Sequence, residues 1–225
     1  MQQYNPFSNY GSSSRAEPWY NTSKYFQSKK WLENRPLDAL RPSLQTLKDK
    51  KDLVGVEIGV GICLHSRAIL DTLDVKKLYM IDLNHPPESP GKELVKDDRV
   101  EFWQGDSTQL ILNLPEELDF AYVDASHDYS FVMAELSILL HKVKQGGLLA
   151  GHDFEQVGVN CAVMTMMCNL WRLIKKNPNL QYASCLDNHP GYPEEYLEYG
   201  FPLDWWIVKD FDLPEKFKLD HLRNG

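Results

Sequence analysis

Two glycines stand in the segment best suited to hold a ligand, Glu57-Ile58-Gly59-Val60-Gly61, at the end of an apolar run. Glycines at a strand-to-helix turn let the backbone approach a ligand closely, beside the N-terminus of a helix. A dinucleotide-binding loop would carry a third small residue where Leu64 stands. Glu57 would repel a pyrophosphate but attract an amino group. We therefore expect Glu57, Gly59 and Gly61 to bind a cofactor that carries a positive charge.

Further acids follow the next two strands. Asp82 stands roughly 20 residues beyond the glycines, where a carboxylate can accept hydrogen bonds from both hydroxyls of a ribose. Asp106 and Ser107 follow the third strand, where an acid and a hydroxyl could contact an adenine amino group. Each acid alone is commonplace, because acids at strand ends also cap helices. Acids at successive strand ends, where such sheets bind ligands, favour a nucleoside-containing cofactor.

A candidate metal site combines residues after the fourth and fifth strands. Asp124 follows one and His152-Asp153 follows the other, so neighbouring parallel strands would bring the three side chains together. Two carboxylates and an imidazole can bind a divalent metal such as Mg²⁺ or Mn²⁺, although Mg²⁺ prefers oxygen ligands. In the alternative interpretation, Asp153 caps the next segment and His152 hydrogen-bonds a loop. Both interpretations stay open at this point.

His127, three residues after Asp124, is the candidate general base. Histidine is the side chain most easily poised to take a proton near neutral pH. A lone histidine is usually structural, but His127 shares a strand edge with the expected cofactor and metal ligands. We therefore predict that His127 and Asp124 are catalytic, with Asp124 also bordering the cofactor.

These side chains need a parallel sheet to bring them together. From residue 53 onward short apolar runs alternate with longer helical patterns, which predicts βαβ units. Strands are expected over residues 53–58, 78–81, 100–103, 118–123, 147–150, 181–186 and 205–209. Helices are expected over residues 66–73, 131–143 and 160–176. Residues 22–50 also have helical spacing, with a kink or split at Pro42.

The chain divides into two parts. Residues 1–50 are expected to form a flexible arm, rich in Ser, Asn and Gln over the first 20 residues, and a helical segment. Residues 51–225 form the main domain, which suits a chain of 225 residues. The arm carries several aromatic residues and could join a dimer, so a homo-oligomer is among the expected partners.

The composition of the chain limits the classes of partner that we expect. A net charge of −8 and a pI near 5.4 argue against a protein that grips a phosphate backbone, so we expect a small-molecule substrate and no nucleic acid. No signal peptide and no apolar stretch of about 20 residues are evident, which predicts a cytoplasmic protein without a membrane partner. The four cysteines form no Cys-x-x-Cys pair, so we expect buried free thiols.

Taken together, residues 54–210 resemble the class I S-adenosylmethionine-dependent methyltransferases. The run from Asp124 through His127 to Tyr129, followed by Gly146-Gly147 and His152-Asp153, resembles methyltransferase domain 24 and the metal-dependent O-methyltransferases of macrolide sugars, antibiotics and catechols. The resemblance implies an α/β fold: a Rossmann-like, seven-stranded, mostly parallel sheet with an antiparallel last strand and helices on both faces.

The resemblance also implies S-adenosyl-L-methionine as cofactor, a magnesium ion held by Asp124, His152 and Asp153, and His127 as the base. One difference is His152, where the metal-dependent relatives usually carry an acid. The expected reaction is O-methylation of a sugar or natural-product hydroxyl. Two alternatives stay open: a nucleotide-dependent oxidoreductase or epimerase, which Leu64 and Glu57 disfavour, and a non-catalytic cofactor-binding module.

Overall fold

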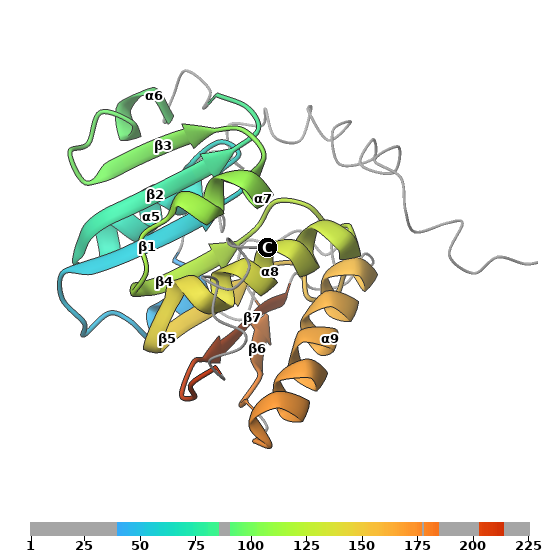
Figure 1. The fold of residues 1–225 in the computed structure, drawn as a ribbon. Helices are drawn as coiled ribbons and strands as arrows, with labels where there is room; N and C mark the ends of the chain where they lie inside the picture. Colours follow the sequence, from blue (N-terminus) through green and yellow to red (C-terminus); the bar gives the residue numbers. More distant parts are fainter. Residues whose placement is uncertain (1–39, 86–90, 177, 185–202, 214–225) are drawn as a thin grey trace, which may run out of the picture.

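The computed structural model describes residues 40–85, 91–176, 178–184 and 203–213, and these residues contain a seven-stranded sheet (Figure 1). The strands lie in the order β3-β2-β1-β4-β5-β7-β6. Their bounds are β1 (Leu53–Ile58), β2 (Val75–Asp82), β3 (Val100–Gln104), β4 (Leu118–Val123), β5 (Val143–Gly151), β6 (Gln181–Ser184) and β7 (Leu203–Val208). Strands β1 to β5 run parallel, whereas β7 is antiparallel to β5 and β6. The predicted Rossmann-like sheet is confirmed.

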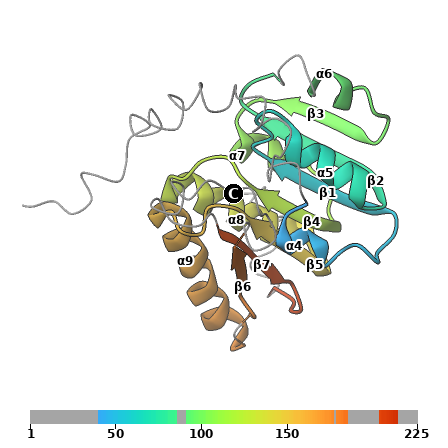
Figure 2. The same ribbon diagram turned by 180° about the vertical axis from the view of Figure 1, so that it is seen from behind.

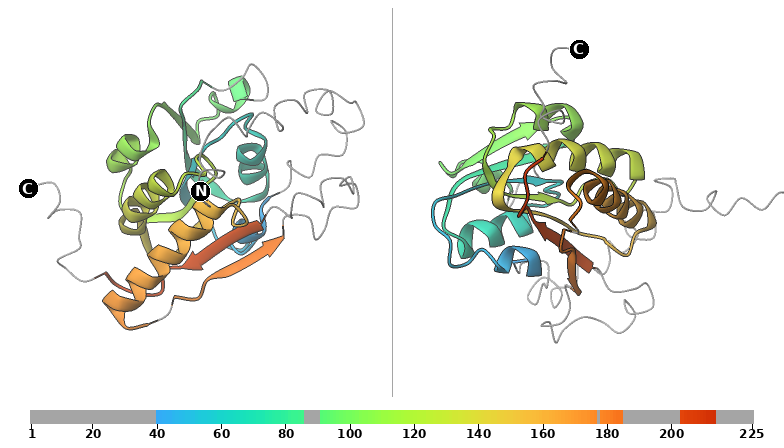
Figure 3. Two further views of the ribbon diagram at one scale, coloured as in Figure 1. Left: turned by 90° about the vertical axis from the view of Figure 1, so that its right-hand side faces the viewer. Right: turned by 60° about the horizontal axis from the view of Figure 1, so that its bottom comes forward.

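Helices cover both faces of the sheet. They are α4 (Pro42–Gln45), α5 (Leu64–Thr72), α6 (Gly91–Leu94), α7 (Ser107–Leu110), the 3-10 helix η3 (Ile111–Asn113), α8 (Tyr129–Lys142) and α9 (Val157–Ile174). α8 and α9 lie on one side of the sheet and α4 and α5 on the other, as the opposite views of Figure 1 and Figure 2 and the turned views of Figure 3 show. In a sheet covered by helices on both faces, ligands bind at the carboxyl ends of the parallel strands.

Alternation along the strands divides the core between the two faces. On β4, Ala121 and Val123 pack with residues of α8 and α9, whereas Phe120 and Tyr122 pack with residues of α4 and α5. This is the two-residue period of a strand with a helical layer on each side. All four residues are buried, so β4 is fixed in register at the centre of the molecule and its carboxyl end is held firmly.

Two strands begin three or more residues before their predicted first residue. β2 begins at Val75, three residues before the predicted Leu78, and β5 begins at Val143, directly after α8. The predicted strand begins at Gly147, but the observed strand already includes Gly146 and the three residues before it. Gly146 has a φ of +77°, and the pairing of β4 with β5 shifts register near Leu118. The irregularity lets extended backbone continue through the glycines.

The segment before the sheet is helical only briefly within the described residues. Pro42 is the first residue of α4, which agrees with the predicted split at this proline, because its fixed φ suits a first helical turn. Leu44 and Leu47 are buried in the core cluster shared with α5. The rest of the expected helix and the arm, residues 1–39, lie outside the described residues.

α9 corrects two expectations. By length and composition it is long and apolar enough to cross a membrane, so the expectation that no stretch would qualify is wrong. Such a helix is weak evidence for a membrane, since Val163 and Met166 on its inner face lie in the core beside α8. Cys161 and Cys168 are free but exposed on its outer face, whereas Cys63 is the expected buried free thiol.

Candidate functional site

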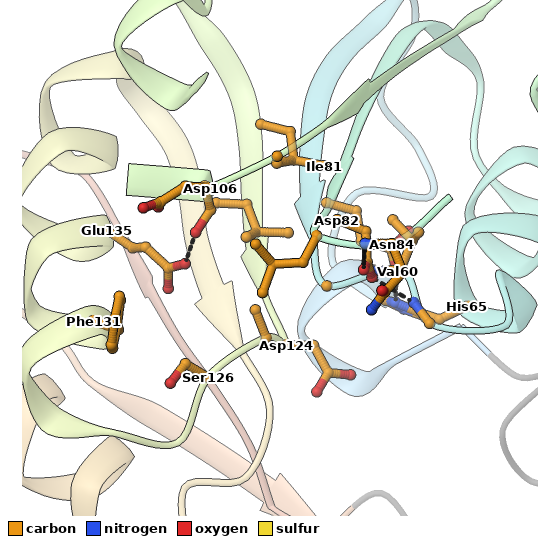
Figure 4. A pocket seen from close by; sticks show the side chains of 18 of the residues that line it. Val60, His65, Ile81, Asp82, Asn84, Asp106, Asp124, Ser126, Phe131 and Glu135 are labelled. Atoms are coloured by element: carbon orange, nitrogen blue, oxygen red, sulfur yellow. Dashed lines mark hydrogen bonds and ion pairs between the residues drawn. The ribbon is translucent and has the colours of Figure 1, made fainter. Parts of the chain in front are cut away.

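A cavity of about 970 Å³ opens at the carboxyl ends of the central strands (Figure 4). Its volume lies at the upper end of the range for small-molecule sites. Every residue predicted to bind the cofactor lines it. These residues are Glu57, Gly59, Gly61, Asp82, Asp106, Ser107 and Asp124. The parallel sheet therefore brings together, in one hollow, side chains that are separated by up to 67 positions in the sequence.

The glycine turn after β1 is fixed by its neighbours. Gly59 has a φ of +83°, and a Cβ atom there would clash with the backbone carbonyl of Asp124. Gly61 also has a positive φ, of +48°, but a Cβ there would meet nothing. Gly59 is therefore required for the close approach of β1 to the end of β4. Gly61 has no such neighbour and lines the cavity.

Asp82 holds this turn from the end of β2. Its Oδ2 accepts hydrogen bonds from the backbone N–H groups of Val60, at 3.0 Å, and Gly61, at 3.1 Å. Its Oδ1 accepts one from the N–H of Asn84, at 2.9 Å. The carboxylate is thus pre-positioned on the wall of the cavity, next to the turn, in the place where a ribose would be held.

Glu57 lies at the wall with both oxygens engaged. Its residue is 1% exposed, Oε1 lies 2.8 Å from Nδ1 of His65, and Oε2 accepts a short hydrogen bond from the hydroxyl of Ser66. Nε2 of His65 accepts a hydrogen bond from the backbone N–H of Arg41, at 3.4 Å. The carboxylate therefore anchors the first turn of α5 to β1 while still lining the cavity.

Arg41 is a site residue that the sequence reasoning missed. It is 7% exposed and lines the cavity beside His65 and Glu57. The available signal was a basic residue directly before a proline that starts a helix, in a segment interpreted as simple packing. Its guanidinium brings a positive charge to the wall of the cavity.

A buried network holds Arg41 in place. Asp204, on β7, accepts hydrogen bonds through Oδ2 from the backbone N–H of Ser43, at 2.7 Å, and through Oδ1 from the hydroxyl of Tyr122, at 2.7 Å. The rings of Tyr122 and His65 have centroids 4.5 Å apart. Because Asp204 and Ser43 are fully buried, the start of α4 is tied to the last strand of the sheet.

The opposite end of the cavity combines α7 and α8. Oδ1 of Asp106 accepts hydrogen bonds from the N–H of Thr108, at 2.9 Å, and from its hydroxyl, at 2.7 Å, and so caps α7. The hydroxyl of Ser107 donates a short hydrogen bond to Oε1 of Glu135. Sequence reasoning also missed Glu135, although an acid beside Leu136 and within the apolar stripe of α8 was a visible signal.

The predicted base and metal ligands form a connected cluster. Nε2 of His127 lies 2.7 Å from Oδ2 of Asp153. Nδ1 of His152 lies 3.1 Å from Oδ1 of Asp153 and 3.7 Å from Oδ1 of Asp124. Asp153 has a φ of +58°, a conformation that Asp tolerates better than most residues. Asp153 thus bridges two histidines that follow different strands.

Charge within this cluster is balanced by the histidines. Burial lowers the pKa of His152, but the carboxylates of Asp124 and Asp153 outweigh it and hold that pKa well above the usual range. Burial raises the pKa of Asp124. Burial also raises the pKa of Asp153, but the charge of His152 and the hydrogen bond from His127 outweigh burial and hold that pKa well below the usual range. The hydrogen bond to Asp153 raises the pKa of His127 against burial.

The same cluster offers a donor set for a metal ion. One ligand atom from each of Asp124, His152 and Asp153 lies within 4.8 Å of the others. Two carboxylates and one imidazole suit a transition metal such as Mn²⁺ better than Mg²⁺. Nε2 of His152 is buried without a hydrogen-bond partner among the described residues. The donors therefore fit a divalent metal, and binding it would displace the proton that His152 otherwise carries.

The sequence of residues 54–154 matches the methyltransferase domain 24 family, described as a methyltransferase domain. The chain is an S-adenosylmethionine-dependent methyltransferase. The matched segment runs from β1 to the loop after β5 and contains every predicted site residue, from Glu57 to Asp153. This match supports an enzyme that uses S-adenosylmethionine over the oxidoreductase, epimerase and non-catalytic alternatives.

Solved structures share the fold of this methyltransferase at low sequence identity. Precorrin 8W decarboxylase from Methanobacterium thermoautotrophicum is 20% identical, with a TM-score of 0.51 over 73% of this chain and 86% of its own. An rRNA methylase from Streptococcus thermophilus is 14% identical, with a TM-score of 0.51 over 81% of this chain and 97% of its own.

A third similar structure is a complex between the Haloferax volcanii Trm112 methyltransferase activator and a putative methyltransferase. It is 14% identical, with a TM-score of 0.52 over 91% of this chain and 100% of the other. A comparison with curated proteins finds no match. At these identities the solved structures establish the fold of the methyltransferase and not its acceptor.

The expectation that nucleic acid is excluded as a partner is wrong. It rested on the net charge of −8, yet an rRNA methylase and a methyltransferase bound to the Trm112 activator share this fold. The net charge of a whole chain is a sum over its surface and does not report the field at the mouth of one cavity. Acidic composition therefore does not remove nucleic acid from the candidate acceptors.

Proposed function

We propose that this methyltransferase transfers the methyl group of S-adenosylmethionine to a hydroxyl of a small molecule, such as a sugar or a natural product, with His127 as the base. The contact between His127 and Asp153, at 2.7 Å, carries the proposal. His127 is half exposed and directly follows Ser126, which lines the cofactor cavity. A base oriented by a carboxylate at the mouth of a cofactor site is the arrangement that proton abstraction requires.

The cavity suits S-adenosylmethionine in its size and in the order of its polar groups. Asp82 is placed for the ribose and Asp106 for the adenine, and Figure 4 shows Asp106 at the side of the cavity away from Asp82 and His65. The guanidinium of Arg41 and the carboxylate of Glu57 supply opposite charges on the wall of the same cavity, which complement the carboxylate and ammonium groups of the methionine part. Gly61 leaves the turn open for the cofactor.

His127 would take the proton through one defined nitrogen. Nε2 faces Asp153, so in the neutral ring Nε2–H donates to Oδ2 and Nδ1 is left as the acceptor. In the reaction the hydroxyl proton moves to Nδ1, the hydroxyl oxygen bonds to the methyl carbon, and the carbon–sulfur bond breaks to release S-adenosylhomocysteine. Asp153 then stabilises the imidazolium, as the orienting acid of a catalytic triad does.

Alignment and proton transfer divide the catalytic task. The sulfonium is already activated, so holding the hydroxyl in line with the methyl group is the main task, and alignment can supply about 7–11 kcal/mol. A positioned base typically adds about 10²–10⁴-fold. When bound by Asp124, His152 and Asp153, a divalent metal would orient the hydroxyl and lower its pKa.

Transfer of a radiolabelled methyl group tests the proposal. The wild type, His127→Gln and the control His141→Gln are incubated with labelled S-adenosylmethionine and glycosides, phenols or total RNA, with EDTA or Mn²⁺. His141 lies in the last turn of α8 and lines neither cavity nor cluster. We expect labelled ethers of small molecules, a kcat about 10²–10⁴-fold lower in His127→Gln, and no change in the control.

Two results would count against the proposal. Label found only in RNA, or only on nitrogen, sulfur or carbon, would overturn the small-molecule hydroxyl as acceptor. Equal kcat values in the wild type and His127→Gln would overturn the base. Turnover that EDTA abolishes and Mn²⁺ restores would add the metal to the mechanism, whereas turnover indifferent to both would leave Asp124 and His152 as a structural ion pair.

A further inference from the structure

Glu135 is a buried acid in the wall of the cofactor cavity. Its residue is 1% exposed, and it projects from α8 toward the side of the cavity that Asp106 and Ser107 form (Figure 4). Oε1 accepts the short hydrogen bond from the hydroxyl of Ser107. Oε2 is buried and has no hydrogen-bond partner among the described residues. An oxygen left in this state is costly in a folded protein, so it points to a group that is supplied from outside the chain.

Burial favours the neutral form of this carboxyl. It raises the pKa of Glu135 to about 7, the nearby charge of Asp106 acts in the same sense, and the hydrogen bond from Ser107 opposes both. Asp106, in the loop before α7, is thus the charged group that faces Glu135 from the elements packed against α8. In the neutral form Oε1 accepts from Ser107, and Oε2–H becomes a hydrogen-bond donor without an acceptor.

The base of the cofactor offers the matching groups. Adenine presents ring nitrogens that accept hydrogen bonds and an exocyclic amino group that donates them. Oδ1 of Asp106 is occupied by Thr108, which leaves Oδ2 for the amino group. A second ionised acid beside Asp106 would add repulsion, whereas a neutral carboxyl adds a donor for a ring nitrogen. The two acids therefore complement the two kinds of group on the edge of the base.

We propose that Glu135 reads the base of the cofactor, with its neutral carboxyl donating a hydrogen bond from Oε2 to a ring nitrogen of the adenine. The inference rests on the assignment of the cavity to S-adenosylmethionine. Cofactor affinity then depends on pH: the proton is present below about pH 7 and is lost above it, so binding weakens as the pH rises. Glu135 is a specificity residue in this scheme and takes no part in methyl transfer.

Calorimetric titration with S-adenosylhomocysteine from pH 6 to pH 9 tests this inference. The proteins are the full-length wild type, Glu135→Gln, Glu135→Leu and the control Glu101→Gln. Glu101 lies on β3, pairs with Lys77 and does not line the cavity. Glutamine keeps a donor and an acceptor but cannot ionise, whereas leucine keeps only the bulk. Thermal denaturation of each variant verifies that it is folded.

We expect the wild type and Glu101→Gln to lose affinity about tenfold per pH unit above pH 7, relative to Glu135→Gln. The ratio to Glu135→Gln matters because the amino group of the ligand, His127 and His152 titrate in every protein and cancel in it. Glu135→Leu should bind at least about tenfold more weakly than Glu135→Gln at pH 6, since it lacks the donor.

An analogue with a hypoxanthine base supplies a second measurement. Hypoxanthine carries a proton on N1, where adenine has an acceptor, so S-inosylhomocysteine should bind the wild type at least about tenfold more weakly than the adenine compound at pH 6. Glu135→Leu should discriminate less between the two. The proposal is overturned if the wild type and Glu135→Gln have the same pH profile and Glu135→Leu binds as they do. No binding by the wild type at any pH would instead overturn the cofactor cavity itself.

Discussion

Asp153 accepts a hydrogen bond from His127 although the two residues follow different strands, β5 and β4, with 2.7 Å between Oδ2 and Nε2. The contact forms because β4 and β5 are parallel neighbours, so the loops that leave them emerge at the same edge of the sheet. It fixes the imidazole ring next to Ser126, a residue that lines the cavity, and leaves Nδ1 as the nitrogen that does not face Asp153.

Asp153→Asn should separate orientation from charge at this contact. Asparagine keeps the size of the side chain and tolerates the positive φ of this position, but it cannot stabilise an imidazolium. We expect kcat to fall about 10²-fold or more while the Kd for S-adenosylhomocysteine stays within about threefold. Steady-state kinetics and calorimetry measure the two quantities. Asp210→Asn, at an exposed ion pair with Lys176, is the control, and an unchanged kcat in Asp153→Asn would contradict the assigned role.

Gly59→Ala should abolish cofactor binding. Its Cβ would clash with the carbonyl of Asp124 in a backbone conformation with φ of +83°, so β1 and β4 must separate where the cavity begins. Gly146→Ala is the matched control, because φ there is +77° and no atom lies within 4 Å of the added carbon. We expect about 1 kcal/mol of destabilisation in the control and at least about 3 kcal/mol in Gly59→Ala, measured by urea denaturation. Similar stabilities of the two variants would contradict the close approach.

Asp204→Asn should loosen α4 and weaken cofactor binding from a distance. Both carboxylate oxygens accept hydrogen bonds in a fully buried position, and an amide would turn one acceptor into a donor that faces another donor. We expect about 3 kcal/mol lower stability and a several-fold higher Kd for S-adenosylhomocysteine, because Arg41 loses its anchor. Asp49→Asn, on the surface, should change neither quantity. Normal affinity in a destabilised Asp204→Asn protein would show that Arg41 does not depend on this network.

The ion pair of Asp97 with Arg99 should stabilise the folded protein only while the carboxyl group of Asp97 is ionised. Its side-chain hydrogen bonds with Arg99 lower its pKa from 3.8 to about 2, so the stabilisation is present above about pH 4 and is lost as the pH falls toward 2. The pair is partly exposed, which limits the effect to about 1 kcal/mol or less. The difference in melting temperature between wild type and Asp97→Asn should shrink between pH 4 and pH 2. A difference that is constant with pH would contradict the ionic origin.

Sequence reasoning located the groups that lie next to a strand end, because a parallel sheet brings all its carboxyl ends to one edge. Asp82 and Asp124 were found in this way. Glu135, Arg41 and Asp204 were missed, since each reaches the site from a separate element. Glu135 comes from the side of a helix, Arg41 from a segment before the sheet, and Asp204 from the last strand. Their placement depends on tertiary packing that no local spacing encodes.

The bounds of the strands likewise could be predicted where local sequence determines them and could not where pairing with a neighbouring strand does. β1 and β4 have the predicted bounds, because their apolar runs are complete and buried. β5 begins four residues earlier than predicted, because Gly146 and Gly147 lie within the strand, where its pairing with β4 shifts register. A glycine permits several backbone conformations. Whether a strand ends at the glycine or continues through it with an irregularity depends on the pairing with the neighbouring strand.

The most direct test of the cofactor assignment is a calorimetric titration of the full chain with S-adenosylhomocysteine, in the wild type and in Asp82→Ala. Asp82 holds the glycine turn through two backbone N–H groups and borders the expected ribose position. We predict one site per chain with a micromolar Kd in the wild type and at least about tenfold weaker binding in Asp82→Ala. An absence of binding in the wild type, or equal binding in the two proteins, would contradict the assignment of this cavity to the cofactor.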